Sequence, residues 1–253
     1  MDWGRAKTVL IISFLMLNVL LGFQLWNSRS DKVHSLTDTA IAMEETNKLL
    51  ASKNITVQMK EIPKETPKLK AVNYKETYSD KTTISLPEPV STVNFFGRSR
   101  MKSVLDKAGV NHAEQYELDP AASKEGLQVM NQMYDKLPLF DITLQLLEQK
   151  GKLTGYKQTY VEVQSGGDAK EQKVISAYTA LKSLADIHLK DNSVITDVRL
   201  GYHGQRFDAD TQYMLPVWRV VLNSGELFYV EAFSGAVEGT QDGKETADAR
   251  MAR

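Results

Sequence analysis

The stretch Thr8–Trp26, TVLIISFLMLNVLLGFQLW, decides how the rest of this chain is arranged. It contains no Asp, Glu, Lys or Arg, and about 20 apolar residues in a helix are enough to span the hydrocarbon core of a bilayer. The run ends in Gln24-Leu25-Trp26-Asn27, which offers no small-x-small site for cleavage of a secretory signal. The sequence therefore predicts an uncleaved transmembrane helix, with a cleaved signal or a buried core helix as the alternatives.

The charged residues beside this run predict its orientation. Arg5 and Lys7 precede it on a very short segment, and positive charge is typical of the cytoplasmic side of a membrane helix. Arg29 and Lys32 follow on the other side and weaken the asymmetry. We expect residues 1–7 to form a cytoplasmic stub, residues 8–28 to cross the cell membrane once, and almost all of the remaining chain to be extracytoplasmic.

The composition restricts what that outer part does. Its 42% hydrophobic and 25% charged residues are ordinary for a packed domain, and the length allows one large or two small domains. The net charge of −1 gives no electrostatic argument for binding nucleic acid. The absence of cysteine excludes thiol catalysis, cysteine-ligated metals and disulfides.

Two residues inside the predicted membrane helix indicate contact with another helix. Asn18 and Gly22 are four residues apart and therefore share a face. Polar and small residues at such positions are typical of helix–helix contacts in lipid. The alternative is a single tolerated amide in an otherwise apolar anchor.

A juxtamembrane helix is expected over about residues 36–52. Apolar or small residues and one asparagine recur there at alternating spacings of four and three, which is the pattern of a coiled-coil seam. The seam consists of Leu36, Ala40, Met43, Asn47 and Leu50. Alternatively, this stripe packs against the protein's own domain. Whether the helix continues from the anchor stays open, because Ser35 and Asp38 resemble a capping pair that begins a new helix.

The predicted fold class is α+β, with two extracytoplasmic units that each combine an antiparallel sheet with helix. Residues 29–165 form the first unit, in which two alternating runs around Gly151 predict a hairpin over residues 142–163. Gly166-Gly167-Asp168 marks a boundary.

The second unit covers residues 166–237 and reads as one helix followed by a three-stranded meander. The helix is expected over Lys173–His188, where apolar residues follow one stripe. The strands are expected over residues 194–202, 215–222 and 226–233. Residues 238–253 have no apolar periodicity and are expected to be a polar, frayed tail.

No motif points to an enzyme. The four histidines, His34, His112, His188 and His203, are too scattered to form a helical metal-binding pair. Asp208-Ala-Asp210 resembles the start of a calcium loop, but the sixth position is Tyr213 instead of glycine. We therefore assign no catalytic residue, no metal site and no cofactor.

Three stretches carry a resemblance to a known family. Met1-Asp-Trp3-Gly-Arg5-Ala-Lys7-Thr directly before the anchor, Thr154-Gly-Tyr-Lys-Gln-Thr-Tyr160, and Leu215-Pro-Val-Trp218-Arg-Val are similar to the YycI (also WalI) family. That family consists of membrane-anchored accessory proteins of the WalK–WalR two-component system. The resemblance covers the full length in layout, and Pro216–Gly225 with Leu227–Val237 also resembles the hairpin of PepSY- and YycH-like domains.

The resemblance implies a non-enzymatic regulator of a sensor histidine kinase. Its partners are then the kinase WalK and a YycH-like sister protein, both contacted through membrane helices, and its effect is on cell-wall metabolism genes. Self-association is left open. The alternative function is an extracytoplasmic PepSY-like module that binds or inhibits a peptide, a protease or a wall component. An exposed apolar groove near Trp218 and Phe228 would favour that alternative, although strand alternation places Trp218 in the core.

Overall fold

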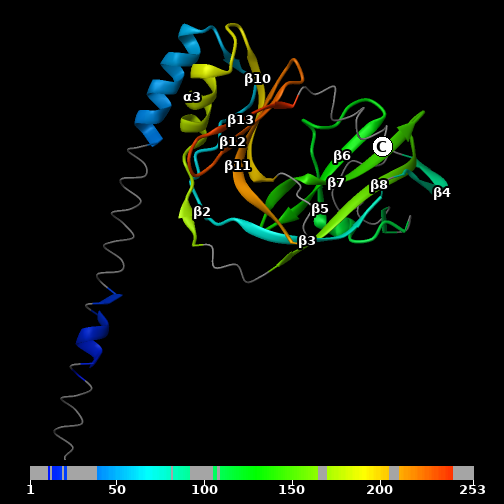
Figure 1. Cartoon of the computed structure of the whole chain (residues 1–253), viewed down its shortest axis with the longest axis horizontal. Helices are drawn as coiled ribbons and strands as arrows, with labels where there is room; N and C mark the ends of the chain where they lie inside the picture. Colours follow the sequence, from blue (N-terminus) through cyan, green and yellow to red (C-terminus); the bar gives the residue numbers. More distant parts are fainter. Residues whose placement is uncertain are drawn as a thin grey trace, which may run out of the picture.

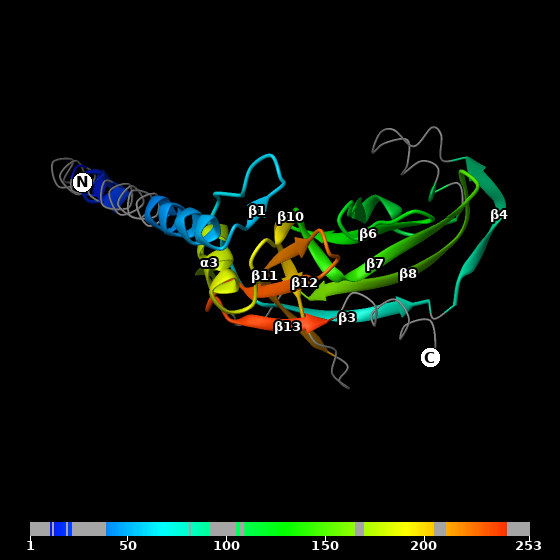
Figure 2. The same cartoon turned by 90° about the horizontal axis from the view of Figure 1, so that it is seen from above.

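The computed structural model describes residues 11, 13–18, 20–21, 39–80, 82–91, 105–106, 109–164, 170–204 and 211–241. It is mostly β-sheet with few helices, which makes it an α+β protein. Figure 1 shows the strands as one extended body, with α3 and the helix over residues 39–52 side by side at one end. In Figure 2, β4 lies at the opposite end.

The long hairpin near the middle of the chain was predicted from its alternating residues, and it is confirmed. Strands β7 (Leu137–Gln149) and β8 (Lys152–Gln164) pair in antiparallel fashion, and Gln149 lies opposite Lys152. Lys150 and Gly151 both have positive φ, as a two-residue type I′ turn requires. Before it, β5 (Tyr116–Leu118) pairs with β6 (Leu127–Tyr134), and β6 pairs with β7.

The predicted helix and meander are also present. Helix α3 (Ala177–Ile187) begins four residues later than predicted, because Ser176 caps it by accepting a hydrogen bond from the Thr179 amide at 3.1 Å. Just before that cap, β9 (Gln172–Lys173) is extended and pairs with β2 (Lys68–Leu69). The meander consists of β10 (Val194–His203), β11 (Gln212–Leu222) and β12 (Leu227–Glu231).

The expectation of a frayed tail from residue 238 is wrong for its first residues. Strand β13 (Val237–Gln241) pairs in antiparallel fashion with β12 and extends the meander by one strand. Its Val237, the last residue assigned to the second unit, packs against the core and lies at the start of this strand.

The strands of both predicted units join one 11-stranded sheet. β1 (Thr56–Val57) pairs in parallel with β10, while β3 (Val72–Ser79) lies between β11 and β8. Tyr202 of β10 also pairs with Leu139 of β7, so β10, β11, β3, β8 and β7 close a ring. A cluster of buried side chains fills this ring: Val72, Tyr74, Leu139, Ile142, Val161, Tyr202 and Met214. The division into two units at residues 165–166 stays a prediction.

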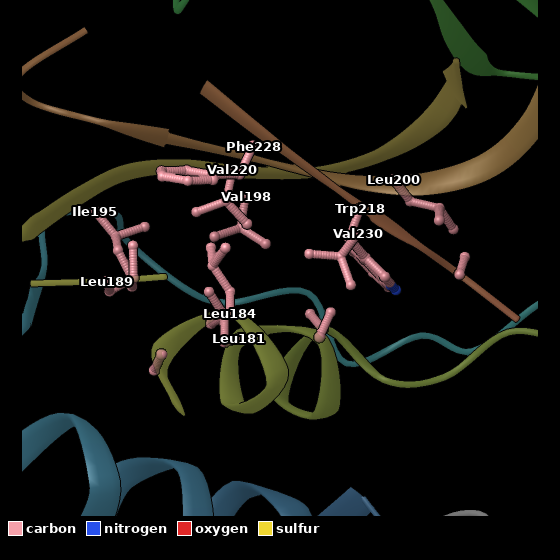
Figure 3. Close-up of a cluster of buried hydrophobic side chains, with 14 of the residues drawn as sticks. Leu181, Leu184, Leu189, Ile195, Val198, Leu200, Trp218, Val220, Phe228 and Val230 are labelled. Carbon is pink, nitrogen blue, oxygen red and sulfur yellow. The ribbon is translucent and has the colours of Figure 1, made fainter. Parts of the chain in front are cut away.

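The largest core lies between the meander and α3. One face of the three strands presents alternate residues toward the helix, because successive side chains of a strand point to opposite sides. Trp218 is 1% exposed there, and its indole N–H donates to the Ile175 carbonyl at 3.0 Å. Figure 3 shows the strands above α3 and the 39–52 helix beneath it, with these labelled side chains in between: Leu181, Leu184, Leu189, Ile195, Val198, Leu200, Val220, Phe228 and Val230.

A further core lies under β4 (Ile84–Ser91), which pairs with the first residues of β8, from Lys152 to Tyr156. Its members come from β4, β5, β6, β7, β8, the short 3-10 helix η2 (Ala113–Gln115) and the segments that contain Leu105 and Val110. The buried residues of this cluster are Leu86, Leu105, Val110, Ala113, Tyr116, Met130, Leu144, Leu146, Leu153, Tyr156 and Tyr160.

Candidate partner-binding site

The 39–52 helix packs on the outer side of α3 through a mixed apolar and polar face. Leu50 is 5% exposed and belongs to the core that α3 shares with the meander, and Leu49 packs against the same cluster. One turn earlier, Thr46 is 0% exposed. Its hydroxyl donates to the backbone carbonyl of Tyr178 in α3 at 2.9 Å, which satisfies the one polar group in the middle of the contact.

An ion pair lies beside this hydrogen bond. The Lys182 ammonium of α3 donates to the Glu45 carboxylate at 2.6 Å, and both side chains are largely in solvent. The hydrogen bond and the charge of Lys182 lower the pKa of Glu45, and the same pair raises the pKa of Lys182. Exposed pairs of this kind contribute little stability, so this one mainly specifies how the two helices align.

The end of the 39–52 helix is fixed to the end of α3. The Lys53 ammonium donates to the carbonyl of Ala185 and, at 3.2 Å, to that of Asp186. The last carbonyls of a helix lack intrahelical partners and carry partial negative charge, so a lysine there is favourable. Next to it, the Asn54 side-chain amide donates to the Asn192 side-chain oxygen at 2.6 Å. The backbone N–H of Asn192 donates to the Lys53 carbonyl at 3.0 Å.

The predicted seam is only partly engaged by the domain. Leu50 is buried, whereas Ala40 and Asn47 are exposed and Met43 is 38% exposed. Leu36 lies outside the described residues. The helix therefore packs on its own domain through Thr46, Leu49 and Leu50, and it leaves Ala40, Met43 and Asn47 of the seam exposed. The apolar pattern did not predict that Thr46 is buried. The signal available in the sequence was its spacing of four from both Ala42 and Leu50, which places the three residues on one face.

The residues predicted inside the membrane are described in part. Asn18 is helical and exposed, and its side-chain amide donates to the Phe14 carbonyl at 2.9 Å, within the same helix. The apolar neighbours are exposed as well: Ile11, Phe14, Leu15, Met16, Leu17, Leu20 and Leu21. Gly22 and both ends of the predicted anchor lie outside the described residues. Within the part of the chain that the structure describes, no helix has both the length and the apolar character needed to cross a membrane.

Sequence reasoning missed a buried charge cluster on the other face of the meander. Arg219 of β11 is 2% exposed and forms two hydrogen bonds with Asp119, which is 0% exposed; one of them measures 2.8 Å. Arg219 also donates to Asp197 of β10 at 3.0 Å, and its guanidinium lies 4.4 Å from the ring centre of Phe140. Because Asp119 follows β5, this cluster joins the first half of the chain to the meander.

A second cross-strand contact surrounds His203, one of the four histidines too scattered in the sequence for a helical metal-binding pair. Its Nδ1 lies 2.9 Å from both carboxylate oxygens of Asp141 on β7, and its ring stacks on Tyr229 at 3.8 Å. The Glu238 carboxylate lies 3.4 Å from its other ring nitrogen. Gly201 and Gly204 allow this arrangement. A Cβ on Gly201 would lie 2.6 Å from the Phe140 ring, and a Cβ on Gly204 would lie 2.4 Å from the Tyr213 carbonyl oxygen.

No group of three or more His, Cys, Asp or Glu suited to a metal occurs among the described residues. A cavity of about 220 Å³ lies at the start of α3, between its first turn and the 39–52 helix. It is lined by Thr39, Thr66, Lys173, Val174, Ile175, Ser176 and Thr179. Trp218 and Phe228, considered as a possible groove, are 1% and 3% exposed and belong to the core.

Comparison with known proteins places the chain in a family. The sequence model of a family described as YycI protein matches residues 27–233, which is more than half of the chain. None of the curated proteins matches. A crystal structure of an uncharacterized protein from Eubacterium rectale is 11% identical with a TM-score of 0.34. That match covers 61% of this chain and 56% of the other, so the chain spans little more than half the length of that protein.

Proposed function

Because the chain belongs to the YycI family, we propose that it is a non-enzymatic, single-pass membrane regulator of a WalK-type sensor histidine kinase. The family as a whole is associated with the WalK–WalR system. In this proposal the N-terminus is cytoplasmic, residues 8–28 cross the cell membrane, and the α+β part lies outside the cell. The protein acts together with a YycH-like protein and so controls genes of cell-wall metabolism.

The observation that carries this proposal is the exposed seam on the 39–52 helix. This helix is anchored to the domain through Thr46 and Leu50, yet it leaves Ala40, Met43 and Asn47 exposed. A docked helix normally turns its most apolar stripe inward, so an outward stripe of small and apolar residues with one asparagine suits contact with another helix. The seam directly follows the proposed membrane span in the sequence, where the helices of membrane partners would lie.

The membrane span supplies the second contact in this proposal. Asn18 and Gly22 share one face, and a polar residue combined with a small one favours close packing and interhelical hydrogen bonding in lipid. In the described helix the Asn18 amide donates to the Phe14 carbonyl, which leaves its side-chain oxygen as an acceptor for a partner helix.

Substitutions in the anchor test the proposal. Asn18→Leu and Gly22→Leu in the full chain should each weaken co-purification with the kinase and the YycH-like protein from membranes, by about tenfold if one interhelical contact of about 1–2 kcal/mol is lost. Ser13→Leu is the matched control, because it adds the same side chain on another face of the helix. Unchanged recovery of both partners, with unchanged kinase phosphorylation, would exclude the proposed contact.

A chimeric protein separates the anchor from the outer domain. Replacing residues 8–26 with an unrelated apolar span keeps the membrane attachment but removes the specific face. Loss of both partners in this chimera supports recognition through the anchor. Full recovery would instead move recognition to the outer domain, and the exposed seam would then be tested with Met43→Lys and Asn47→Lys.

A further inference from the structure

Contacts with α3 fix the position of the 39–52 helix at two separate points along its axis. Glu45 and Thr46 contact Lys182 and Tyr178, and Lys53 reaches the end of α3 after seven more residues. Seven helical residues rise about 10 Å, or roughly two turns. A helix held at two points two turns apart cannot turn about its own axis without breaking one of them.

The nature of these bonds also prevents sliding along α3. Thr46 and Lys53 both donate to backbone carbonyls, which are fixed parts of α3 and cannot follow a moving partner as a flexible side chain would. A shift by one turn would leave the buried Thr46 hydroxyl without its acceptor and would remove Lys53 from the carbonyls of Ala185 and Asp186. An unsatisfied buried donor is costly, so alternative registers are disfavoured.

We infer that α3 acts as a rotational clamp: it holds the 39–52 helix in the one orientation that leaves Ala40, Met43 and Asn47 exposed. Glu45, Thr46 and Lys53 are then positioning residues, because each of them bonds to α3 and none belongs to the seam. The regulatory consequence rests on the proposed function, since it requires that the seam meets a partner. The clamp itself is tested without any partner.

Thiol labelling measures the orientation directly, because the chain has no cysteine. Single cysteines replace the exposed residues Ala40, Met43 and Asn47, and another replaces Leu50, which is 5% exposed on the docked face. The full chain is reconstituted in nanodiscs and labelled with a polar maleimide. Each exposed position should react at least about tenfold faster than Leu50→Cys, because a buried position reacts only when the helix opens locally. Equal rates at the exposed and the buried positions would overturn the clamp.

Breaking the contact should abolish this difference. Thr46→Arg places a large charged side chain at a position with 0% exposure, so the helix must leave α3. The labelling rates of Leu50→Cys and Met43→Cys should then agree within about threefold, as expected for an undocked helix. Ala51→Arg is the control, since it adds the same charge at an exposed position of the same helix. An unchanged ratio in Thr46→Arg, or a lost ratio in Ala51→Arg, would contradict the inference.

Locking the clamp links it to regulation. A double variant, Glu45→Cys with Lys182→Cys, is joined by a short bifunctional thiol reagent across the position of the ion pair. A clamp that acts by holding orientation predicts that the locked protein regulates the kinase as the unmodified chain does, and that Thr46→Arg does not. Loss of regulation on locking would show that the contact must open, and would overturn the inference. If the unmodified chain has no effect on the kinase, the proposed function fails, while the labelling result still decides the clamp.

Discussion

Asp119 and Arg219 are 100 residues apart in the sequence, yet they form a doubly hydrogen-bonded ion pair with side chains that are 0% and 2% exposed. Asp197 accepts a further hydrogen bond from the same guanidinium at 3.0 Å, and Arg199 lies 3.7 Å from Asp119. The pair ties the segment after β5 to the middle of β11. It is therefore a sensitive point for the stability of the whole sheet.

Removing one member of this pair should destabilise the protein strongly. Asp119→Ala leaves Arg219 buried with only part of its charge balanced, and breaking a buried pair in this way costs about 3–5 kcal/mol of unfolding free energy. Chemical denaturation of the full chain in detergent, followed by near-ultraviolet circular dichroism, measures the loss. The double variant Asp119→Leu with Arg219→Met is the control and should lose much less, because neither charge stays behind. Equal losses would argue against the pair as the cause.

The same pair predicts a dependence of stability on acid. Burial alone would raise the pKa of Asp119, but the hydrogen bond and charge of Arg219, with the charge of Arg199, lower it overall. A carboxyl group with a lowered pKa in the folded state adds stability above its unfolded pKa of about 3.9, and this stability is lost as pH falls toward the folded value. The unfolding free energy should therefore fall below about pH 4. The slope in this range should be flatter in Asp119→Asn, and an identical slope would contradict the assignment.

Gly201 should not tolerate a side chain. A Cβ at this position would lie 2.6 Å from the Phe140 ring and 2.6 Å from the Pro138 carbonyl oxygen. Gly201→Ala is expected to cost about 1–3 kcal/mol, as overpacking in a dense interior usually does. Thermal unfolding measures the effect. Adding Phe140→Leu should recover only part of the loss, because the backbone oxygen of Pro138 stays in place; full recovery would mean that the ring alone causes the clash.

Trp218 should stabilise the core through both its volume and its N–H group. Trp218→Phe removes the hydrogen bond to the Ile175 carbonyl and leaves a small space, for an expected loss of about 1–3 kcal/mol. Trp218→Ala should lose more, about 3–5 kcal/mol, because the cavity is larger. Denaturant midpoints of the two variants check this order. A neutral Trp218→Phe would show that neither the hydrogen bond nor the extra ring volume contributes.

The parts of the fold that the sequence predicted are those that depend on neighbouring residues. The hairpin around Lys150 and Gly151 follows from alternation and turn geometry, and the meander follows from three apolar runs separated by turn residues. Pairings between distant segments cannot be predicted from a local sequence pattern. The parallel contact of β1 with β10, and the contact of Tyr202 with Leu139, depend on the complete topology.

The candidate site shows the same limit at the level of one helix. Apolar spacing selected Leu36, Ala40, Met43, Asn47 and Leu50, whereas the domain binds the face that contains Ala42 and Thr46. Threonine reads as polar in a sequence pattern, but its methyl group packs and its hydroxyl is satisfied by the Tyr178 carbonyl. The buried side of this helix therefore combines the apolar contacts of Leu49 and Leu50 with one polar residue whose partner lies opposite it. The Asp119–Arg219 pair was likewise invisible, because nothing local connects the two residues.

The position of β3 determines which pairings form last during synthesis. This strand occupies residues 72–79, but its two neighbours, β8 and β11, are synthesised much later. Synthesis from the N-terminus therefore produces β3 long before either neighbour arrives. The β7–β8 hairpin forms from adjacent segments, whereas β3 must wait for residues 159–164 and 212–214, and long-range pairing of this kind is slow. A chain that ended before residue 212 would lack β11, so one edge of β3 would stay unpaired.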